Sequence, residues 1–175
     1  MLFRSRLEAG ALGVKSQWTD VSEVVDTALK RLARRLASHR VVRGLPSDLP
    51  FAKADPLLLE QALVNLLDNA AKYAPPDSVI TIHAQADAQK IALTIADEGP
   101  GIPVAELSHI FDKFYRARKG DLGAAGTGLG LSVARGFVEA FGGTLDAANR
   151  VDLGGAVFTL TMPVGEKPGE GDHGK

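Results

Sequence analysis

The chain has 175 residues, and its 20 lysines and arginines nearly balance its 21 aspartates and glutamates, for a formal net charge of −1. This balance gives no electrostatic reason to expect nucleic acid or a membrane surface as a partner. The absence of cysteine excludes disulfides and thiolate chemistry, and no apolar run approaches the roughly 20 residues of a membrane-spanning helix. The length is sufficient for one domain with its own hydrophobic core.

Residues 1–13 end in Arg-Leu-Glu-Ala-Gly-Ala-Leu-Gly, a pattern typical of the last turns of a helix that glycine stops. Two interpretations remain open: a frayed terminus, or the stub of a longer helix that belongs to a neighbouring domain. The second is favoured because the chain begins in mid-pattern. We expect residues 1–15 to be this stub and a linker, 16–164 to be the main domain, and 165–175 to be a charged, glycine-rich, disordered tail.

A first helix is predicted over residues 21–36. Thr19 or Asp20 can cap it, and Glu23 stands three residues after Asp20, as in a capping box. Apolar residues recur at helical spacing, and a group of basic residues lies on the other side as a solvated face: Lys30, Arg31, Arg34 and Arg35. Two short strands, 39–43 and 51–54, are predicted next, separated by the turn-rich segment 44–50.

Asp55 and Pro56 predict the start of a second helix, which runs to Tyr73, because an N-cap followed by proline is a common helix start. Leucines and alanines give it a wide buried stripe, and its other face is polar: Gln61, Asn65, Asp68, Asn69 and Lys72. Asparagine costs roughly 0.5–0.7 kcal/mol relative to alanine inside a helix, so two of them four residues apart are unusual on a merely solvated face. Amide oxygens can ligate Mg²⁺ without adding charge, and this face therefore favours a metal–nucleotide site.

The second half of the chain alternates strands with helices. Two strands, 78–86 and 90–96, are predicted to form a hairpin. They are followed by a short helix at 103–107 and a polar, mobile loop at 116–126. A helix at 129–141, ended by Gly142 and Gly143, comes before the last two strands, 144–149 and 156–162.

Two glycine clusters lie at the ends of these elements. Residues 97–102, Asp-Glu-Gly-Pro-Gly-Ile, follow a buried strand, and residues 126–131, Gly-Thr-Gly-Leu-Gly-Leu, open a helix. Asp97 is an acceptor that needs a donor such as an adenine amino group, although a cap on the following turn is the simpler interpretation. Glycine-rich backbone at a helix start is a potential phosphate site. The second cluster is neither a P-loop nor a Rossmann fingerprint, so a nucleotide would need a different scaffold.

Between the glycine clusters, residues 111–116 read Phe-Asp-Lys-Phe-Tyr-Arg. Three aromatic residues in five suggest a hydrophobic plug that anchors a loop. The functional interpretation is that Lys113 or Arg116 reaches the terminal phosphates of a nucleotide while the phenylalanines act as the hinge of a lid. The four histidines have no metal-ligand spacing, and we assign them no role.

Taken in order, these motifs resemble the catalytic ATP-binding domain of bacterial sensor histidine kinases over residues 18–164. Residues 65–73 are similar to the family's N box, 97–102 to its first glycine box, 111–114 to its F box, and 126–131 to its second glycine box. Gly154, Gly155 and Ala156 are similar to the distal glycine pair. Residues 6–12, 69–73 and 112–116 look most like the Kdp-type potassium-responsive sensor kinases.

The resemblance implies a Bergerat-type two-layer α/β sandwich, with a mixed, mostly antiparallel sheet of about five strands, about three helices on one face, and an ATP lid. By the same resemblance, ATP and Mg²⁺ are the cofactors, Asn69 binds the metal with Asn65 nearby, and Asn65, Lys113 and Arg116 are catalytic. Lys72 and Arg116 would meet phosphate, Tyr73 would pack on the base, and Asp97 would accept from adenine. The remaining nucleotide-binding positions implied are Gly99, Gly101, Ile102, Phe114, Gly126, Thr127, Gly128, Leu129, Gly130 and Leu131.

The implied reaction is transfer of the ATP γ-phosphoryl group to a histidine of a dimerisation domain absent from this chain, and then to an aspartate of a response regulator. The implied location is cytoplasmic, in an inner-membrane sensor kinase, with a monomeric fragment and no direct membrane contact. Two alternatives stay open. One is an ATPase of the gyrase/MutL kind, which uses a glutamate where this chain has Asn65, and the other is a docking module that binds ATP without transferring phosphate.

Overall fold

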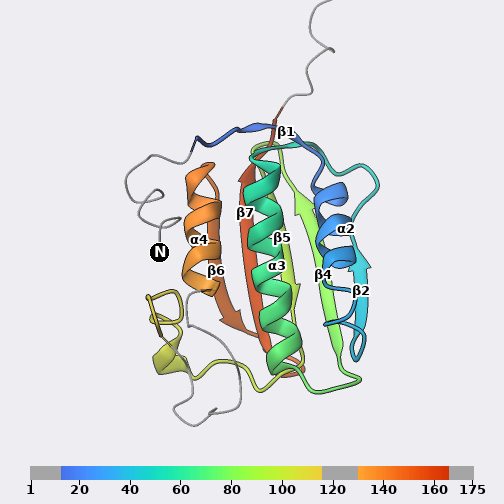
Figure 1. The fold of residues 1–175 in the computed structure, drawn as a ribbon, viewed down its shortest axis with the longest axis vertical. Helices are drawn as coiled ribbons and strands as arrows, with labels where there is room; N and C mark the ends of the chain where they lie inside the picture. Colours follow the sequence, from blue (N-terminus) through green and yellow to red (C-terminus); the bar gives the residue numbers. More distant parts are fainter. Residues whose placement is uncertain (1–12, 116–129, 166–175) are drawn as a thin grey trace, which may run out of the picture.

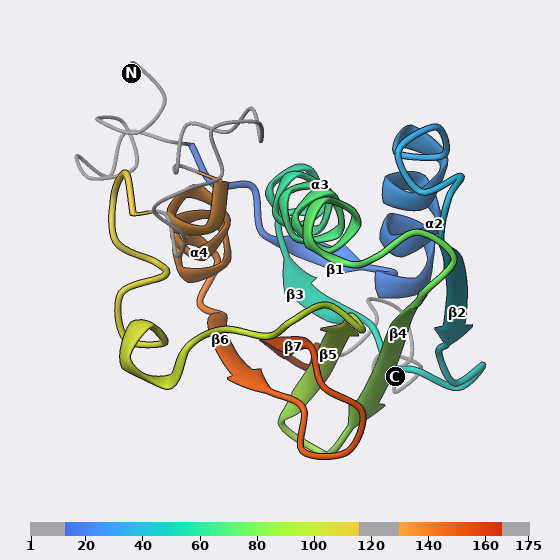
Figure 2. The same ribbon diagram turned by 90° about the horizontal axis from the view of Figure 1, so that it is seen from below.

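The computed structural model describes residues 13–115 and 130–165. It has two layers: a twisted sheet, and three helices that cover one face of that sheet (Figures 1 and 2). Residues 1–12 of the stub and linker predicted at 1–15, the whole loop predicted at 116–126, and residues 166–175 of the tail predicted at 165–175 lie outside the described residues. None of the helices in the described ranges is long and apolar enough to cross a membrane.

The main sheet has five strands in the order β2-β4-β5-β7-β6. Their bounds are Arg40–Gly44 for β2, Val79–Ala86 for β4, Lys90–Ala96 for β5, Thr144–Asn149 for β6 and Ala156–Pro163 for β7. Only β2 and β4 pair in parallel, and the other three pairings are antiparallel. The prediction of a mixed, mostly antiparallel five-stranded sheet is therefore confirmed.

A second, two-stranded sheet joins β1 (Gln17–Thr19) to β3 (Ala52–Ala54) in antiparallel pairing. Strand β3 was predicted, but β1 was not. The side chain of Thr19 donates to the carbonyl of Ala54 at 3.0 Å, and the backbone N–H of Lys15 donates to Oδ2 of Asp55 at 2.9 Å. The segment that enters the domain is thus fixed to the start of the next helix.

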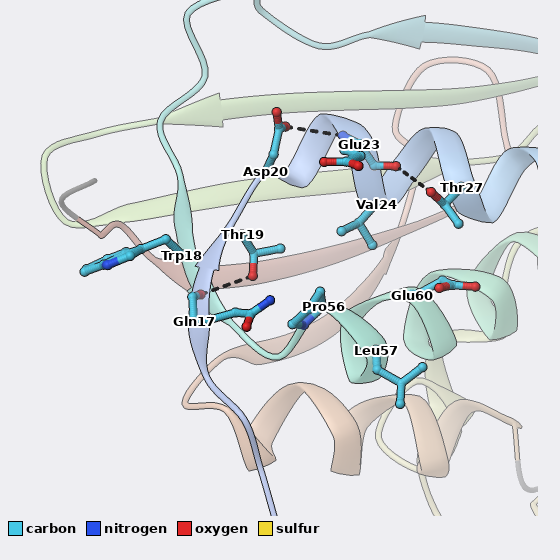
Figure 3. A pocket seen from close by; sticks show the side chains of 10 residues that line it. All are labelled: Gln17, Trp18, Thr19, Asp20, Glu23, Val24, Thr27, Pro56, Leu57 and Glu60. Carbon is cyan, nitrogen blue, oxygen red and sulfur yellow. Dashed lines mark hydrogen bonds between the residues drawn. The ribbon is translucent and has the colours of Figure 1, made fainter. Parts of the chain in front are cut away.

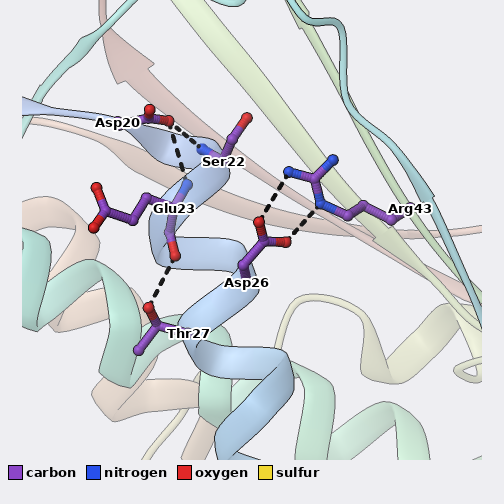
Figure 4. A network of polar contacts seen from close by, with 6 residues as sticks. All are labelled: Asp20, Ser22, Glu23, Asp26, Thr27 and Arg43. Atoms are coloured by element: carbon purple, nitrogen blue, oxygen red, sulfur yellow. Dashed lines mark hydrogen bonds and ion pairs between the residues drawn. The ribbon is translucent and has the colours of Figure 1, made fainter.

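The helices are α2 (Val21–Arg31), α3 (Pro56–Tyr73) and α4 (Gly130–Ala140), with a short 3₁₀ helix, η1, at Val104–Glu106. Oδ1 of Asp20 accepts from the N–H groups of Ser22 and Glu23, and Oδ1 of Asp55 accepts from those of Leu57 and Leu58. Of the two candidate caps for the first helix, Thr19 and Asp20, the structure has Asp20, and the predicted cap Asp55 is confirmed. Figure 4 shows the first cap beside an ion pair in which Asp26 of α2 binds Arg43 of β2, with Nε 2.7 Å from Oδ1.

Helix α2 ends at Arg31, five residues before the predicted end at residue 36. Leu32 and Leu36 are still buried, because a series of turns carries them into the core. The turns bring Ser38 and His39 to the end of α3, where the carbonyl of Ser38 accepts from Asp77 at 2.7 Å and the ring of His39 bonds the carbonyl of Ala74. These tertiary bonds compete with continuation of the helix.

The core lies between α3 and the inner face of the sheet. Leu59, Leu63, Leu66 and Leu67 of α3 are almost fully buried, as are alternating residues of β4, β5 and β7: Ile80, Ile82, Ile91, Leu93, Ile95, Phe158 and Leu160. Each such side chain contributes roughly 1.5–3 kcal/mol by leaving water. This packing fixes α3 over the centre of the sheet (Figure 1), so the polar side of α3 is held in a defined direction.

Candidate nucleotide-binding site

The two polar edges of helix α3 contact different neighbours. Glu60 and Asp68 form ion pairs with Arg31 and Arg35 from the α2 segment, at 3.2 and 2.7 Å. On the other edge, the amide nitrogen of Asn65 donates to the carbonyl of Gly130, the first residue of α4, at 3.2 Å. The basic residues predicted to be solvated are exposed, and two of them also bind α3. The N box therefore lies beside the start of α4.

The asparagine edge fits a metal that takes most of its ligands from a nucleotide. Gln61, Asn65, Asn69 and Lys72 are all partly exposed. The bond to Gly130 uses the amide nitrogen of Asn65 and leaves its oxygen for other partners. Within the described residues, no group of three or more His, Cys, Asp or Glu side chains could hold a metal ion. A cation here would depend on amide oxygens and phosphates, the donor set that Mg²⁺ accepts at nucleotide sites.

Asp97 is buried at the end of β5, with 4% of its surface exposed. Its Oδ1 accepts from the backbone N–H of Gly99 at 2.8 Å and from that of Ala156 at 3.2 Å. Both bonds use one oxygen, so the second oxygen remains an acceptor for a ligand. Oδ1 caps the following turn, so the simpler interpretation of the sequence is confirmed, whereas the contact with an adenine amino group stays a prediction.

The first glycine box packs against the C-terminal end of α3. A Cβ on Gly99 would lie 2.9 Å from Oδ1 of Asp97 and 3.0 Å from the carbonyl oxygen of Tyr73. Glu98 fastens the same loop to the sheet, because its Oε2 accepts from the N–H of Val79 at 2.8 Å. Asp97, Gly99 and Tyr73, which the sequence motifs predict to share one site, are thus brought together. Lys72 turns back over the Tyr73 ring, with Nζ 5.0 Å from its centroid.

The distal glycine pair closes the other side of this loop. Gly155 has a φ of +101°, and a Cβ at this position would overlap the carbonyl oxygen of Asp97. The same oxygen accepts from Nη1 of Arg150 at 3.3 Å. A larger residue than glycine cannot occupy position 155 without displacing Asp97, so the first glycine box and the distal pair form one unit.

Two residues of this unit, Asn149 and Arg150, were missed by sequence reasoning, as was Glu98. Asn149 bonds both the N–H and the carbonyl of Ile102, at 2.7 and 2.6 Å. Its partner is 47 residues away in the chain, and that of Arg150 is 53 residues away. No local pattern marks them, because their partners are backbone atoms that only the β6–β7 hairpin brings near.

The F box forms a hydrophobic plug, as predicted. The rings of Phe111 and Phe158 meet in a T-shaped contact, with centroids 6.4 Å apart, and the Arg135 guanidinium lies 4.6 Å from the Phe111 centroid. Phe114 is 66% exposed with a φ of +63°, and Lys113 is also exposed. Exposure and backbone conformation do not test whether either residue contacts a nucleotide, so the roles of Phe114 and Lys113 stay predictions.

Part of the predicted site lies outside the described residues: Arg116, Gly126, Thr127, Gly128 and Leu129. Of the second glycine box, Gly130 begins α4 and Leu131 packs against the core. Ile102 also packs against the core. The described part of the site therefore consists of the α3 edge, the first glycine box, the distal pair and the start of α4.

A separate cavity of about 410 Å³ lies between β1, α2 and the first turn of α3 (Figure 3). Its lining includes Trp18, Glu23 and Leu57. It adjoins the N-terminal end of α3, whereas Tyr73 and the first glycine box are at the C-terminal end. It contains none of the predicted site residues, and the chemistry described above does not depend on it.

Residues 54–166 match the family model of histidine kinase-, DNA gyrase B- and HSP90-like ATPases. The chain belongs to this family. The match extends from the start of α3 to the end of β7 and includes every element of the candidate site. It confirms the predicted family and the predicted α/β fold.

The relatives of this ATPase domain are sensor kinases. The chain is 39% identical to the sensor protein KdpD of Escherichia coli over 163 residues, which is 93% of this chain and 18% of KdpD. It is 42% identical to the adaptive-response sensory kinase SasA of Synechococcus elongatus over 144 residues, 81% of this chain and 37% of SasA. The chain thus spans well under half the length of these relatives, and the match corresponds to the ATPase domain of a sensor histidine kinase.

The same fold is found in a solved kinase structure. The mycobacterial sensor histidine kinase MprB superimposes on this ATPase domain with a TM-score of 0.74 and 29% sequence identity, covering 86% of this chain and 98% of the MprB chain. The five-stranded sheet covered by three helices is therefore the architecture of a histidine kinase domain, as the motifs predicted.

Proposed function

We propose that this chain binds Mg-ATP and transfers the γ-phosphoryl group to a histidine of a dimerisation domain outside this sequence, from which the group passes to an aspartate of a response regulator. The observation that carries the proposal is the meeting of a buried carboxylate, Asp97, with the end of a helix whose exposed edge is rich in asparagine. A nucleoside triphosphate fits this arrangement. The Asp97 carboxylate can accept from the base, and the amide oxygens of the helix edge can ligate a metal bound to the phosphates.

At the base end, the free oxygen of Asp97 accepts from the exocyclic amino group of adenine. Gly99 lets the loop pass close to both Asp97 and the end of α3, because a Cβ there would lie 2.9 Å from Oδ1 of Asp97 and 3.0 Å from the Tyr73 carbonyl oxygen. Tyr73 packs on the base, and Gly101 and Ile102 complete the floor. A buried carboxylate with a free oxygen selects strongly for a ligand that supplies a donor, since the alternative is an unpaired charge.

At the phosphate end, Asn69 ligates Mg²⁺ with Asn65 beside it, and Lys72, Lys113 and Arg116 bind phosphate oxygens. The metal, when bound, neutralises charge on the phosphates. Phe114 and residues 126–131 belong to the lid and to the start of α4. Phosphoryl transfer needs little covalent chemistry from the protein, so these residues act by positioning the phosphates and offsetting their charge.

The identity of residue 65 favours kinase over hydrolase chemistry. Asn65 is an amide, and its nitrogen is bonded to the carbonyl of Gly130. An amide cannot accept a proton from an attacking water, whereas the carboxylate that gyrase-type ATPases have at this position can. The KdpD and SasA relatives are sensor kinases by name, which supports the same choice.

The partners follow from this role. The chain would act on the dimerisation domain of its own full-length kinase, with its response regulator downstream and no nucleic acid involved. The chain matches 18% of the length of KdpD, a sensor protein by name, and we propose that the domain lies on the cytoplasmic side of an inner-membrane sensor. The isolated chain would be a monomer without direct membrane contact.

The proposal is tested by mixing the chain with the separately produced dimerisation domain of its kinase and γ-labelled ATP. We expect acid-labile label on a histidine of that domain, and much less label at the same ATP concentration when Asp97→Asn replaces the wild-type chain. Release of labelled phosphate with steady turnover and no labelled histidine would favour a gyrase-type ATPase. Binding of ATP with neither product would favour a docking module.

A further inference from the structure

The β6–β7 hairpin holds both ends of the first glycine box. At the near end, the N–H of Ala156 donates to Oδ1 of Asp97, and the N–H of Asp97 donates to the carbonyl of Ala156 at 3.0 Å. At the far end, the side chain of Asn149 bonds Ile102. Asn149 and Ala156 face each other as the last pair of the β6–β7 ladder. The two anchors of the loop are therefore neighbours on adjacent strands.

The contact between Asn149 and Ile102 imitates a backbone pairing. The amide oxygen accepts from the N–H of Ile102 at 2.7 Å, and the amide nitrogen donates to its carbonyl at 2.6 Å. Only an amide side chain presents one acceptor and one donor in this arrangement, and the reversed amide orientation would set like groups against each other. The chemistry of the pair thus fixes the orientation of Asn149.

The loop also approaches Asn149 very closely. A Cβ on Gly101 would lie 2.8 Å from Oδ1 of Asn149, so the glycine leaves just enough room for the side-chain amide. Asn149 is partly buried, which strengthens its hydrogen bonds relative to those in water. Rotation of this side chain would release Ile102, and the loop would then be held by the hairpin only at Asp97.

We propose that Asn149 is a positioning residue for adenine recognition: by holding Ile102 it fixes the loop that aims the free oxygen of Asp97 at the exocyclic amino group. This inference rests on the proposed function. It predicts that Asn149 controls the preference for a base with that amino group more than it controls stability. A side chain that only supported the fold would affect stability without affecting the preference.

The test compares ATP with purine riboside triphosphate, which lacks the exocyclic amino group, by calorimetry. We expect the wild-type chain to prefer ATP by roughly tenfold or more, because Asp97 would otherwise keep an unpaired oxygen. Asn149→Ala should weaken ATP binding by about tenfold, and leave the affinity for the analogue within about twofold, as expected for loss of one oriented contact. The preference should therefore collapse in the variant.

Two further variants complete the design. Asn149→Asp keeps the acceptor for the Ile102 N–H but sets an oxygen against the Ile102 carbonyl. The preference for ATP over the analogue should therefore fall partway. This isosteric variant is used in place of Asn149→Ala if the alanine variant does not fold. Asp146→Ala, at an exposed position of the same strand, should keep the wild-type preference. An unchanged preference in folded Asn149 variants would overturn the inference. If the wild-type chain binds neither nucleotide, the proposed function itself is overturned. This result is obtained from the wild-type chain alone and is therefore distinct from the result that would overturn the inference.

Discussion

The backbone N–H of Ala156 donates a hydrogen bond to Oδ1 of Asp97 across 3.2 Å, although the two residues are 59 positions apart. Together with the bond from Gly99 at 2.8 Å, it commits one oxygen of a buried carboxylate to the protein. The structure therefore separates the two oxygens of Asp97 by role. One organises the loop, and the other is available for a ligand.

Asp97→Asn tests this division. Asparagine can keep its oxygen on the Gly99 and Ala156 N–H groups, but its nitrogen then replaces the free oxygen and opposes the amino group of adenine. ATP affinity should fall about tenfold or more, with little change in the thermal unfolding midpoint. Asp48→Asn, in an exposed loop, is the matched control. Wild-type affinity in Asp97→Asn, measured by calorimetry, would contradict the assignment.

Gly155→Ala tests the close contact between the distal glycine pair and Asp97. Both Gly155 and Gly142 have positive φ, at +101° and +88°, but a Cβ on Gly142 would meet nothing within 4 Å. Gly142→Ala should cost roughly 1–2 kcal/mol from backbone strain alone. Gly155→Ala should cost about 1–3 kcal/mol more, because it also overpacks against the Asp97 carbonyl. Urea unfolding of the two variants gives the comparison, and equal losses would show that the contact is unimportant.

Much of the fold was predictable from the sequence because its signals are local. Asp20 and Asp55 indicate helix starts because aspartate is a favoured N-cap residue. The alternation of apolar and polar residues in β4, β5 and β7 indicates which face of each strand is buried. The end of α2 was mispredicted because Leu32 and Leu36 keep helical spacing while turns deliver them to the core. Strand β1 was missed because its three residues acquire a partner only when β3 is in place.

The part of the site that consists of glycines and of side chains within the sequence motifs was predictable. Asp97, Gly99 and Tyr73 were expected together and lie together. Asn149 could not be identified from the sequence, because its hydrogen bonds are to two backbone atoms of a residue 47 positions away. Sequence patterns report what a residue does for its own element, and less of what it does for a distant loop.

Asp55 should be important for stability. Its carboxylate is 7% exposed and accepts from three N–H groups, those of Lys15, Leu57 and Leu58. Asp55→Ala should lower the free energy of unfolding by about 1–3 kcal/mol, because it removes an N-cap and leaves donors unpaired. Asp20→Ala, at the exposed cap of α2, should cost less, about 0.5–1 kcal/mol. Urea denaturation measures both, and a smaller loss at Asp55 would contradict the account.

Tyr115 should ionise at unusually high pH. Burial raises the pKa of its phenol above the ordinary 10.0, and the nearby Glu106 carboxylate raises it further by its charge and by accepting a hydrogen bond from the phenolic O–H. The folded state therefore keeps this proton longer than the unfolded state, and stability should fall as pH rises from about 10. Absorbance titration of Tyr73→Phe isolates Tyr115, and adding Glu106→Gln should lower its pKa. An unshifted titration would argue against this contact.

The most direct test of the central claim, that a nucleotide lies against the asparagine edge of α3, is calorimetric titration of ATP with and without Mg²⁺. The wild-type chain should bind ATP more tightly with Mg²⁺ than without it. Asn69→Ala should lower the ATP affinity measured with Mg²⁺ by about tenfold and leave the affinity measured without Mg²⁺ unchanged. Gln61→Ala, two turns earlier on the same edge, should behave as wild type. Full Mg²⁺ dependence in Asn69→Ala would contradict the account.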